Sequence, residues 1–280
     1  MKSIGLIDLY INEWHANNYP KWIKEISENT GKDFVVKYAW AEQNTAPVGG
    51  LTTDEWCVEY GVEKCDSIEE LCKKSDYIII LAPANPEKHL GYAEQVLKFK
   101  KNTYIDKTFA PDYATAKKIF DIAEKYGTKF FSTSALRYAE ELDGLKNCQS
   151  AIITGDGVTF EEYIIHQVEI AVKIMGTGCK RVRTENQIRQ NVAHLDYGDG
   201  KGVTLNFATG LPYAVSACTQ ENQLKYTQLS FKYFKNLIAK ILTFFETGES
   251  DFDGAETLEV MKIIEALVKS KEEEGKWQNL

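Results

Sequence analysis

The sequence has no apolar run approaching the ~18–20 residues that a bilayer-spanning helix needs. It shows no secretory leader either, since Met1-Lys2-Ser3 passes directly into Ile4. Its six cysteines form no CxxC pair and no zinc-type spacing, so we expect free thiols in a reducing compartment. These absences predict a cytoplasmic protein that does not enter the membrane.

An excess of positive charge is also missing, because 33 Lys and Arg face 41 Asp and Glu, a net charge of −8. Nucleic-acid-binding proteins usually present a basic face, so we expect no nucleic-acid partner. The composition is otherwise that of an ordinary globular protein, with 44% hydrophobic residues. A chain of 280 residues is long enough for two domains.

The first half of the chain alternates short apolar segments with helical patterns. Apolar runs bounded by breakers are typical of strands buried in a parallel sheet. Pro20 favours the first turn of the first helix, with its cap near Asn18 or Tyr19. The predicted strands are 3–7, 34–41, 77–82, 104–105 and 129–133. This alternation predicts an α/β, Rossmann-like doubly wound parallel sheet, whose ligands bind at the carboxyl ends of the strands.

The second half reads differently. A strong amphipathic helix over 160–176 is followed by mainly β patterns, including a hairpin around Gly198-Asp199-Gly200-Lys201-Gly202. Two more helices are predicted over 231–247 and 255–270. We therefore expect a second α+β domain with an open, mostly antiparallel sheet, and we divide the chain into 1–137 and 138–280.

The turn after the first strand lacks glycine. In dinucleotide-binding folds a G-x-G-x-x-G turn lets backbone amides approach the diphosphate closely. Here the turn is Asp8-Leu9-Tyr10-Ile11-Asn12-Glu13, which puts a negative charge and a large ring in that space. Two interpretations stay open. The turn is a rebuilt ligand pocket of Asp8, Tyr10, Glu13, Trp14 and His15, or a loop packed over the sheet edge. We expect no metal there, because no fourth ligand is evident.

Other polar residues gather near predicted strand ends or along one helix. Pro83, Asn85, His89, Asp106 and Lys107 follow the 77–82 and 104–105 strands, and Glu42 follows the 34–41 strand. In helix 160–176, Glu162, His166, Glu169 and Lys173 form one narrow polar stripe. The spacing alone is that of a solvated helix face.

Three motifs carry a family resemblance. Residues 81–89 read Leu-Ala-Pro-Ala-Asn-Pro-Glu-Lys-His, a strand end with prolines and a histidine opening the next helix. Asp106-Lys107-Thr108 and then Arg137-Tyr138 follow after later strands. In this order and spacing they resemble the Gfo/Idh/MocA family of glucose–fructose oxidoreductase and inositol dehydrogenase, which has Glu-Lys-Pro at the second position. The family's Asp-x-x-x-His helix is matched by Glu162 and His166.

The resemblance implies an NAD(P)-dependent oxidoreductase that acts on a sugar- or cyclitol-like alcohol. It assigns His166 as general base, Lys107 as the electrostatic partner that orients the hydroxyl, and Glu162 as the group that orients or charges His166. Arg137, Tyr138 and Glu169 become substrate-side candidates. The cofactor-side candidates are Asp8, Tyr10, Glu13, Trp14, His15, Glu42, Ala82, Pro83, Asn85, His89 and Asp106.

The cofactor and partner expectations follow from the same resemblance. NAD is favoured over NADP because no arginine at the end of the 34–41 strand could hold a 2′-phosphate. The family's open sheet often forms a dimer, so we expect a homo-oligomer, a dimer or larger. The alternative is a non-redox relative that has lost dinucleotide binding and uses another small ligand, which the sequence of the first turn favours.

Overall fold

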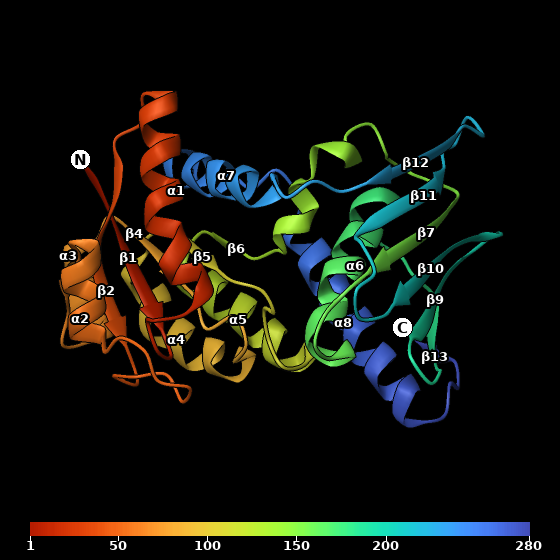
Figure 1. Ribbon diagram of the computed structural model, residues 1–280, viewed down its shortest axis with the longest axis horizontal. Coiled ribbons are helices and arrows are strands. Elements are labelled where there is room, and N and C mark those ends of the chain that lie inside the picture. Colours follow the sequence, from red (N-terminus) through yellow and green to blue (C-terminus); the bar gives the residue numbers. More distant parts are fainter. The chain divides into compact units, whose positions relative to one another are not determined.

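The computed structural model describes residues 1–280, which divide into two compact units. The first unit contains residues 1–133 and 237–251, and the second contains residues 134–236 and 252–280. Residues 237–251 hold most of helix α7 (Tyr233–Thr247), so the chain returns to the first unit late in the sequence (Figure 1). A division of the chain at a single residue cannot assign residues 237–251 to the first unit.

A six-stranded parallel sheet forms the centre of the first unit, in the order β3-β2-β1-β4-β5-β6. In this order the strand sequence changes direction between β1 and β4, which is the usual ligand position in a doubly wound sheet. The strands are β1 (Lys2–Asp8), β2 (Phe34–Ala41), β3 (Glu63–Lys64), β4 (Tyr77–Ile80), β5 (Thr103–Ile105) and β6 (Phe130–Phe131). Near-continuous burial explains why β4 and the middle of β1, residues 4–7, carry no polar side chain apart from the Tyr77 hydroxyl.

Several helices of this unit begin or end at residues that the sequence marks clearly. Besides α7, they are α1 (Trp14–Thr30), α2 (Thr53–Tyr60), α3 (Ile68–Lys74), α4 (His89–Val96) and α5 (Tyr113–Tyr126). Thr52 caps α2, and Gly127 ends α5 in the left-handed conformation. The predicted start of the first helix is wrong, because α1 already begins at Trp14 and holds Pro20 in its interior.

A seven-stranded mixed sheet organises the second unit, in the order β12-β11-β7-β10-β9-β8-β13. Only β7 and β10 pair in parallel, and the other neighbours are antiparallel. The strands are β7 (Ser150–Gly155), β8 (Arg181–Asn186), β9 (Asn191–Gly198), β10 (Lys201–Phe207), β11 (Ala214–Cys218), β12 (Leu224–Gln228) and β13 (Gln278–Asn279). The α/β fold with a second, mostly antiparallel sheet is therefore confirmed.

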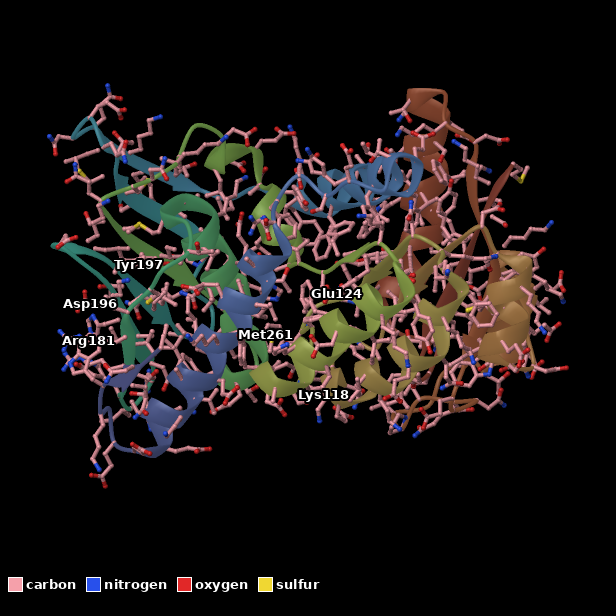
Figure 2. All side chains as sticks on the ribbon, turned by 180° about the vertical axis from the view of Figure 1, so that it is seen from behind. Lys118, Glu124, Arg181, Asp196, Tyr197 and Met261 are labelled. Atoms are coloured by element: carbon pink, nitrogen blue, oxygen red, sulfur yellow. The ribbon has the colours of Figure 1, made fainter.

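Helices α6 (Phe160–Met175) and α8 (Gly254–Glu272) cover one face of this second sheet. Strand residues alternate accordingly, with Ile153, Leu195 and Leu205 buried against the helices. Between two neighbouring strands of this sheet, Arg181 of β8 pairs with Asp196 of β9 (Figure 2). No helix in either unit combines the length and apolarity that crossing a membrane demands.

Candidate functional site

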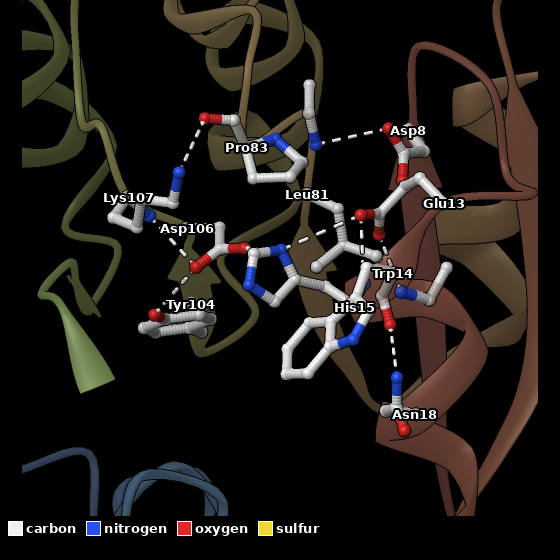
Figure 3. Close-up of polar contacts among 12 residues, drawn as sticks. Asp8, Glu13, Trp14, His15, Asn18, Leu81, Pro83, Tyr104, Asp106 and Lys107 are labelled. Atoms are coloured by element: carbon white, nitrogen blue, oxygen red, sulfur yellow. Dashed lines mark hydrogen bonds and ion pairs between the residues drawn. The ribbon is translucent and has the colours of Figure 1, made fainter. Parts of the chain in front are cut away.

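Several of the predicted cofactor-side residues meet at the carboxyl edge of the first sheet, between β1 and β4 (Figure 3). Asp8 ends β1 and reaches across to the end of β4, where its Oδ1 accepts hydrogen bonds from Ala82 N at 3.1 Å and Leu9 N at 2.7 Å. Ala82 has φ +64°, in the left-handed region that a non-glycine residue rarely adopts. The bond from Asp8 thus helps to hold an unfavourable backbone conformation at the centre of the site.

Glu13 is the N-cap of α1. Its carboxylate accepts hydrogen bonds from His15 N at 2.8 Å and from Ala16 N at 2.5 Å. This cap explains why the helix starts before Pro20, since two otherwise unsatisfied amides are bound and the negative charge complements the helix dipole. An acidic residue before a helix can act as its N-cap, but the sequence does not show the shape of this turn. The position of Glu13 relative to the helix start could therefore not be predicted.

His15 connects the first turn to the end of β5. Its Nδ1 lies 3.1 Å from Asp106 Oδ2 and 3.6 Å from Glu13 Oε2. Asp106 is buried, and its Oδ1 accepts bonds from Lys107 N at 2.9 Å and from Tyr104 Oη at 3.1 Å. The carboxylates of Glu13 and Asp106 therefore flank one imidazole, and Asp8 interacts electrostatically with both of them. We call Asp8, Glu13, His15 and Asp106 the acidic cluster.

Burial dominates the electrostatics of the acidic cluster. It raises the pKa of Asp8 well above its usual value, and Glu13 adds to the rise, although bonds from Leu9 N and Ala82 N oppose it. Burial also raises the pKa of Glu13, against the lowering effect of His15. Asp8 Oδ2 is buried and has no hydrogen-bond partner. The cluster is thus rich in acceptors and poor in donors.

Lys107 lies beside this cluster with its side chain largely buried. Its Nζ donates to Pro83 O at 3.2 Å, which joins the ends of β4 and β5. The peptide bond between Lys107 and Thr108 is cis. The structure therefore brings together Asp8, Glu13, His15, Ala82, Pro83, Asp106 and Lys107, seven of the predicted site residues.

The side chain of His89 contacts the backbone of neighbouring segments. It is fully buried, with Nδ1 3.0 Å from Phe109 O and Nε2 2.6 Å from Leu81 O, so both ring nitrogens are occupied by backbone carbonyls. Burial lowers the pKa of His89, although these bonds oppose the change. His89 contributes by fixing the strand end that carries Ala82 and Pro83.

The remaining cofactor-side residues lie around the edge of the cluster. Glu42, just after β2, accepts bonds from Lys88 Nζ at 2.6 Å and Tyr92 Oη at 2.7 Å, and these bonds lower its pKa. Asn85 donates to Glu87 Oε1 at 3.0 Å. Trp14 is 45% exposed and contacts the His15 and Trp22 rings, and Tyr10 is half-buried in the turn.

The second unit positions its own set of predicted residues along α6. His166 Nδ1 lies 2.6 Å from Ser134 Oγ, and its ring contacts Tyr163 and Tyr213. Ser134 is a partner that the sequence did not indicate, because 32 residues separate the two and no local spacing links them. Glu162 lies one turn earlier, where its backbone N bonds to the cap residue Thr159 at 3.3 Å.

Glu169 and Arg137 form a buried ion pair. Glu169 Oε2 lies 3.1 Å from Arg137 Nη1, its Oε1 accepts from Ser134 N at 3.2 Å, and Arg137 also bonds Glu256 of α8. Burial alone would lower the pKa of Arg137, but Glu169 and Glu256 raise it. Tyr138 is buried next to it, and its carbonyl accepts from Asn236 Nδ2 at 3.0 Å. The polar stripe on α6 is therefore not a solvated face at Glu169.

A separate cavity of about 560 Å³ lies in the second unit and contains none of the predicted site residues. It is bounded by the start of α6, the turn between β8 and β9, the end of β10 and Lys271. Lys271 pairs with Glu161 at 2.6 Å across one wall of this cavity. The structure contains no group of three or more His, Cys, Asp or Glu side chains arranged to hold a metal ion.

These features define a two-unit protein with a Rossmann-type sheet whose polar residues gather at the β1–β4 reversal. Comparison with protein families then gives one match. Residues 42–134 match the family described as "Oxidoreductase family, NAD-binding Rossmann fold", the Gfo/Idh/MocA family. The resemblance to this family is confirmed, and the matched residues contain the 81–89 and 106–108 motifs. A search of curated proteins finds no match.

Solved structures share the fold over nearly the whole chain. A probable dehydrogenase from Thermotoga maritima has a TM-score of 0.80 at 14% identity, covering 99% of this chain and 98% of its own. GenD2 from gentamicin A biosynthesis, in complex with NAD, has a TM-score of 0.78 at 10% identity, covering 100% and 97%. The WlbA dehydrogenase from Chromobacterium violaceum, in complex with NADH and UDP-GlcNAcA, has a TM-score of 0.75 at 11% identity, covering 100% and 96%.

The family match supports an NAD(P)-dependent oxidoreductase with a small-molecule substrate. The first turn of this chain, however, does not fit a diphosphate as it stands. Glu13 binds the amides at the start of α1, and Asp8 leaves a buried carboxylate oxygen without a donor beside them. A diphosphate needs free amides and positive potential at this position.

Proposed function

We propose that the protein is an NAD(P)-dependent oxidoreductase acting on the CH–OH group of a sugar- or cyclitol-like alcohol. The observation that carries this proposal is Lys107, a buried ammonium held 3.2 Å from Pro83 O beside Asp106, at the sheet edge where ligands of such folds bind. The family match supports the reaction class. The sugar-containing complex of the similar WlbA structure supports the substrate class.

In this proposal each polar residue has a role that its surroundings support. Lys107 donates to the substrate hydroxyl and stabilises the negative charge that develops as its proton leaves. His166 takes that proton, because a histidine pKa ordinarily lies near neutrality, and Ser134 fixes the ring through Nδ1. Glu162, one turn before His166 on α6, is the residue that orients or charges the His166 ring in this proposal.

Arg137, Tyr138 and Glu169 belong to the substrate side of the proposal. The Glu169–Arg137 pair holds Ser134 N, and so acts on His166 through its neighbour. Tyr138 follows directly in the same short 3₁₀ helix, Ala135–Tyr138. Their contribution is to fix the backbone that carries the His166 partner.

We further propose NAD as the preferred nucleotide and a homo-oligomer as the assembly. Glu42 would repel a 2′-phosphate at the end of β2. The open face of the second sheet presents Ile152 at 54% and Tyr226 at 73% exposure, apolar surface suited to a second copy. Sedimentation equilibrium measures the assembly, and a monomer at all concentrations would contradict it.

The test is a titration with NADH and NADPH, followed by Trp14 fluorescence and calorimetry, and then a screen of sugars and cyclitols for nucleotide reduction. Lys107→Ala is expected to lower kcat about 10²–10³-fold, and His166→Ala about 10²–10⁴-fold. Lys118→Ala, on the exposed face of α5, and His194→Ala, in β9, are matched controls that should retain activity.

A second candidate is favoured by one observation, the occupation of the α1 amides by Glu13. It is a non-redox protein with this fold that binds another small ligand. Absence of nucleotide binding at millimolar concentration would select this candidate and reject the oxidoreductase.

A further inference from the structure

The start of α1 already carries an anion. In a glycine-rich turn the first amides of this helix point toward the diphosphate, and the helix dipole adds positive potential there. In this chain the two oxygens of Glu13 accept from His15 N at 2.8 Å and Ala16 N at 2.5 Å. The donors that a diphosphate would use are therefore engaged by a carboxylate of the chain itself.

A second observation points to the same conclusion independently of the cap. Asp8 is 1% exposed, its Oδ1 is bonded to Leu9 N and Ala82 N, and its Oδ2 is buried without a donor. Figure 3 shows Asp8 and Glu13, the two ends of the first turn, next to each other. A phosphate entering here would meet an uncompensated acceptor, which costs free energy in a dry environment.

We propose that Glu13 is an internal anion standing in the diphosphate position of the Rossmann turn, so that this turn accepts a diphosphate only after Glu13 has left it. Glu13 then determines ligand selectivity at this turn. The inference rests on the proposed function in its assumption that a dinucleotide is the ligand to be selected, but its test needs no catalysis.

Proton concentration should modulate this selectivity. The charged groups that face Glu13 are Asp8 from β1, His15 from α1 and Asp106 after β5. Burial raises the pKa of both Glu13 and Asp8, and protonation of either carboxylate removes negative charge from the turn. This change favours an anionic ligand, so the affinity for a diphosphate should rise as pH falls.

The experiment measures ADP-ribose binding by calorimetry, because this probe carries the diphosphate without the reactive ring. Wild type, Glu13→Gly and Glu13→Gln are compared at several pH values. Asp112→Gly is the matched control, since Asp112 caps α5 of the same sheet by accepting from Thr115 N at 2.6 Å. Glycine is tolerated at an N-cap, so both glycine variants should fold, which thermal melts verify.

We expect Glu13→Gly to bind ADP-ribose at least about tenfold more tightly than wild type near pH 8, with a smaller pH dependence, which corresponds to about 1.4 kcal/mol. Glu13→Gln should fall between the two, and Asp112→Gly should match wild type. The proposal is overturned if Glu13→Gly binds no more tightly than wild type, or if Asp112→Gly tightens binding equally.

These outcomes separate the inference from the proposed function. Tight ADP-ribose binding by Glu13→Gly, with no alcohol oxidised by wild type, supports the internal anion and rejects the oxidoreductase. Micromolar NADH binding and turnover by wild type, with no gain from Glu13→Gly, supports the oxidoreductase and rejects the internal anion.

Discussion

Each unit buries a group of charged side chains, and the two groups differ in how their charges are matched. In the second unit Arg137 lies between Glu169 and Glu256, and Glu169 also accepts from Ser134 N. In the first unit the acidic cluster holds three carboxylates and one imidazole, and Asp8 Oδ2 has no donor. The charged groups around Arg137 in the second unit satisfy one another, whereas the acidic cluster of the first unit has more hydrogen-bond acceptors than donors.

This difference separates a structural role from a ligand-dependent one. A buried pair with its hydrogen bonds made gives shape, and breaking it leaves an uncompensated charge. A buried carboxylate without a donor raises the free energy of the protein until a proton or a ligand satisfies it. We therefore expect substitutions to have opposite signs in the two places.

The largest expected effect is the loss of Arg137. Arg137→Met keeps the length of the side chain but leaves Glu169 buried without its cation, and we expect a loss of about 3–5 kcal/mol in the free energy of unfolding. Urea denaturation followed by circular dichroism measures it. Adding Glu169→Gln to this variant should recover part of the loss. A loss below about 1 kcal/mol for Arg137→Met would mean that the Arg137–Glu169 pair does not have the structural role proposed.

The sequence could predict those features of the two buried groups that depend on neighbouring residues, but not the contacts between residues far apart in the chain. The strand ends carrying Asp8, Pro83 and Asp106 were predictable, because short apolar runs and breakers mark them locally. Long-range partners were not, since nothing near Ser134 indicates His166, and nothing near residues 237–251 places them in the first unit.

The start of α1 shows a different limit. Proline normally marks the first turn of a helix because it lacks an N–H, so Pro20 was assigned there. In the structure the cap of Glu13 and the burial of His15, Ala16 and Tyr19 outweigh the cost of an interior proline. The capping function of Glu13 therefore became visible only with the fold.

The next effect has the opposite sign and concerns Asp8. Its pKa is raised in the folded protein, mainly by burial, so the folded state holds this proton to higher pH than the unfolded chain does. Stability from this group is present below the unfolded pKa, near 3.9, and is lost as pH rises through the folded pKa. Asp8→Asn removes this penalty.

We therefore expect Asp8→Asn to stabilise the protein by about 1 kcal/mol at pH 8, a size common for single substitutions, and by less at pH 5. Thermal melts across this range measure the difference. A stabilisation independent of pH, or a destabilisation at pH 8, would show that the Asp8 carboxylate is satisfied in a way that the comparison between the two units does not include.

The smallest effect belongs to an exposed ion pair, which sets the baseline for both buried groups. Arg181 Nε lies 2.8 Å from Asp196 Oδ2, with the two side chains 47% and 30% exposed, and Arg181 also packs over the Trp277 ring. Because truncating Arg181 would disturb that packing, we propose a double-mutant cycle of Arg181→Gln and Asp196→Asn. Solvent screens this pair, so its coupling should be about 0.5 kcal/mol or less and should decrease at high salt.

The corresponding cycle of Arg137→Met and Glu169→Gln should give a coupling several times larger that salt hardly changes, because water does not reach that pair. Equal couplings in the two cycles would remove the distinction between a buried framework and a surface contact.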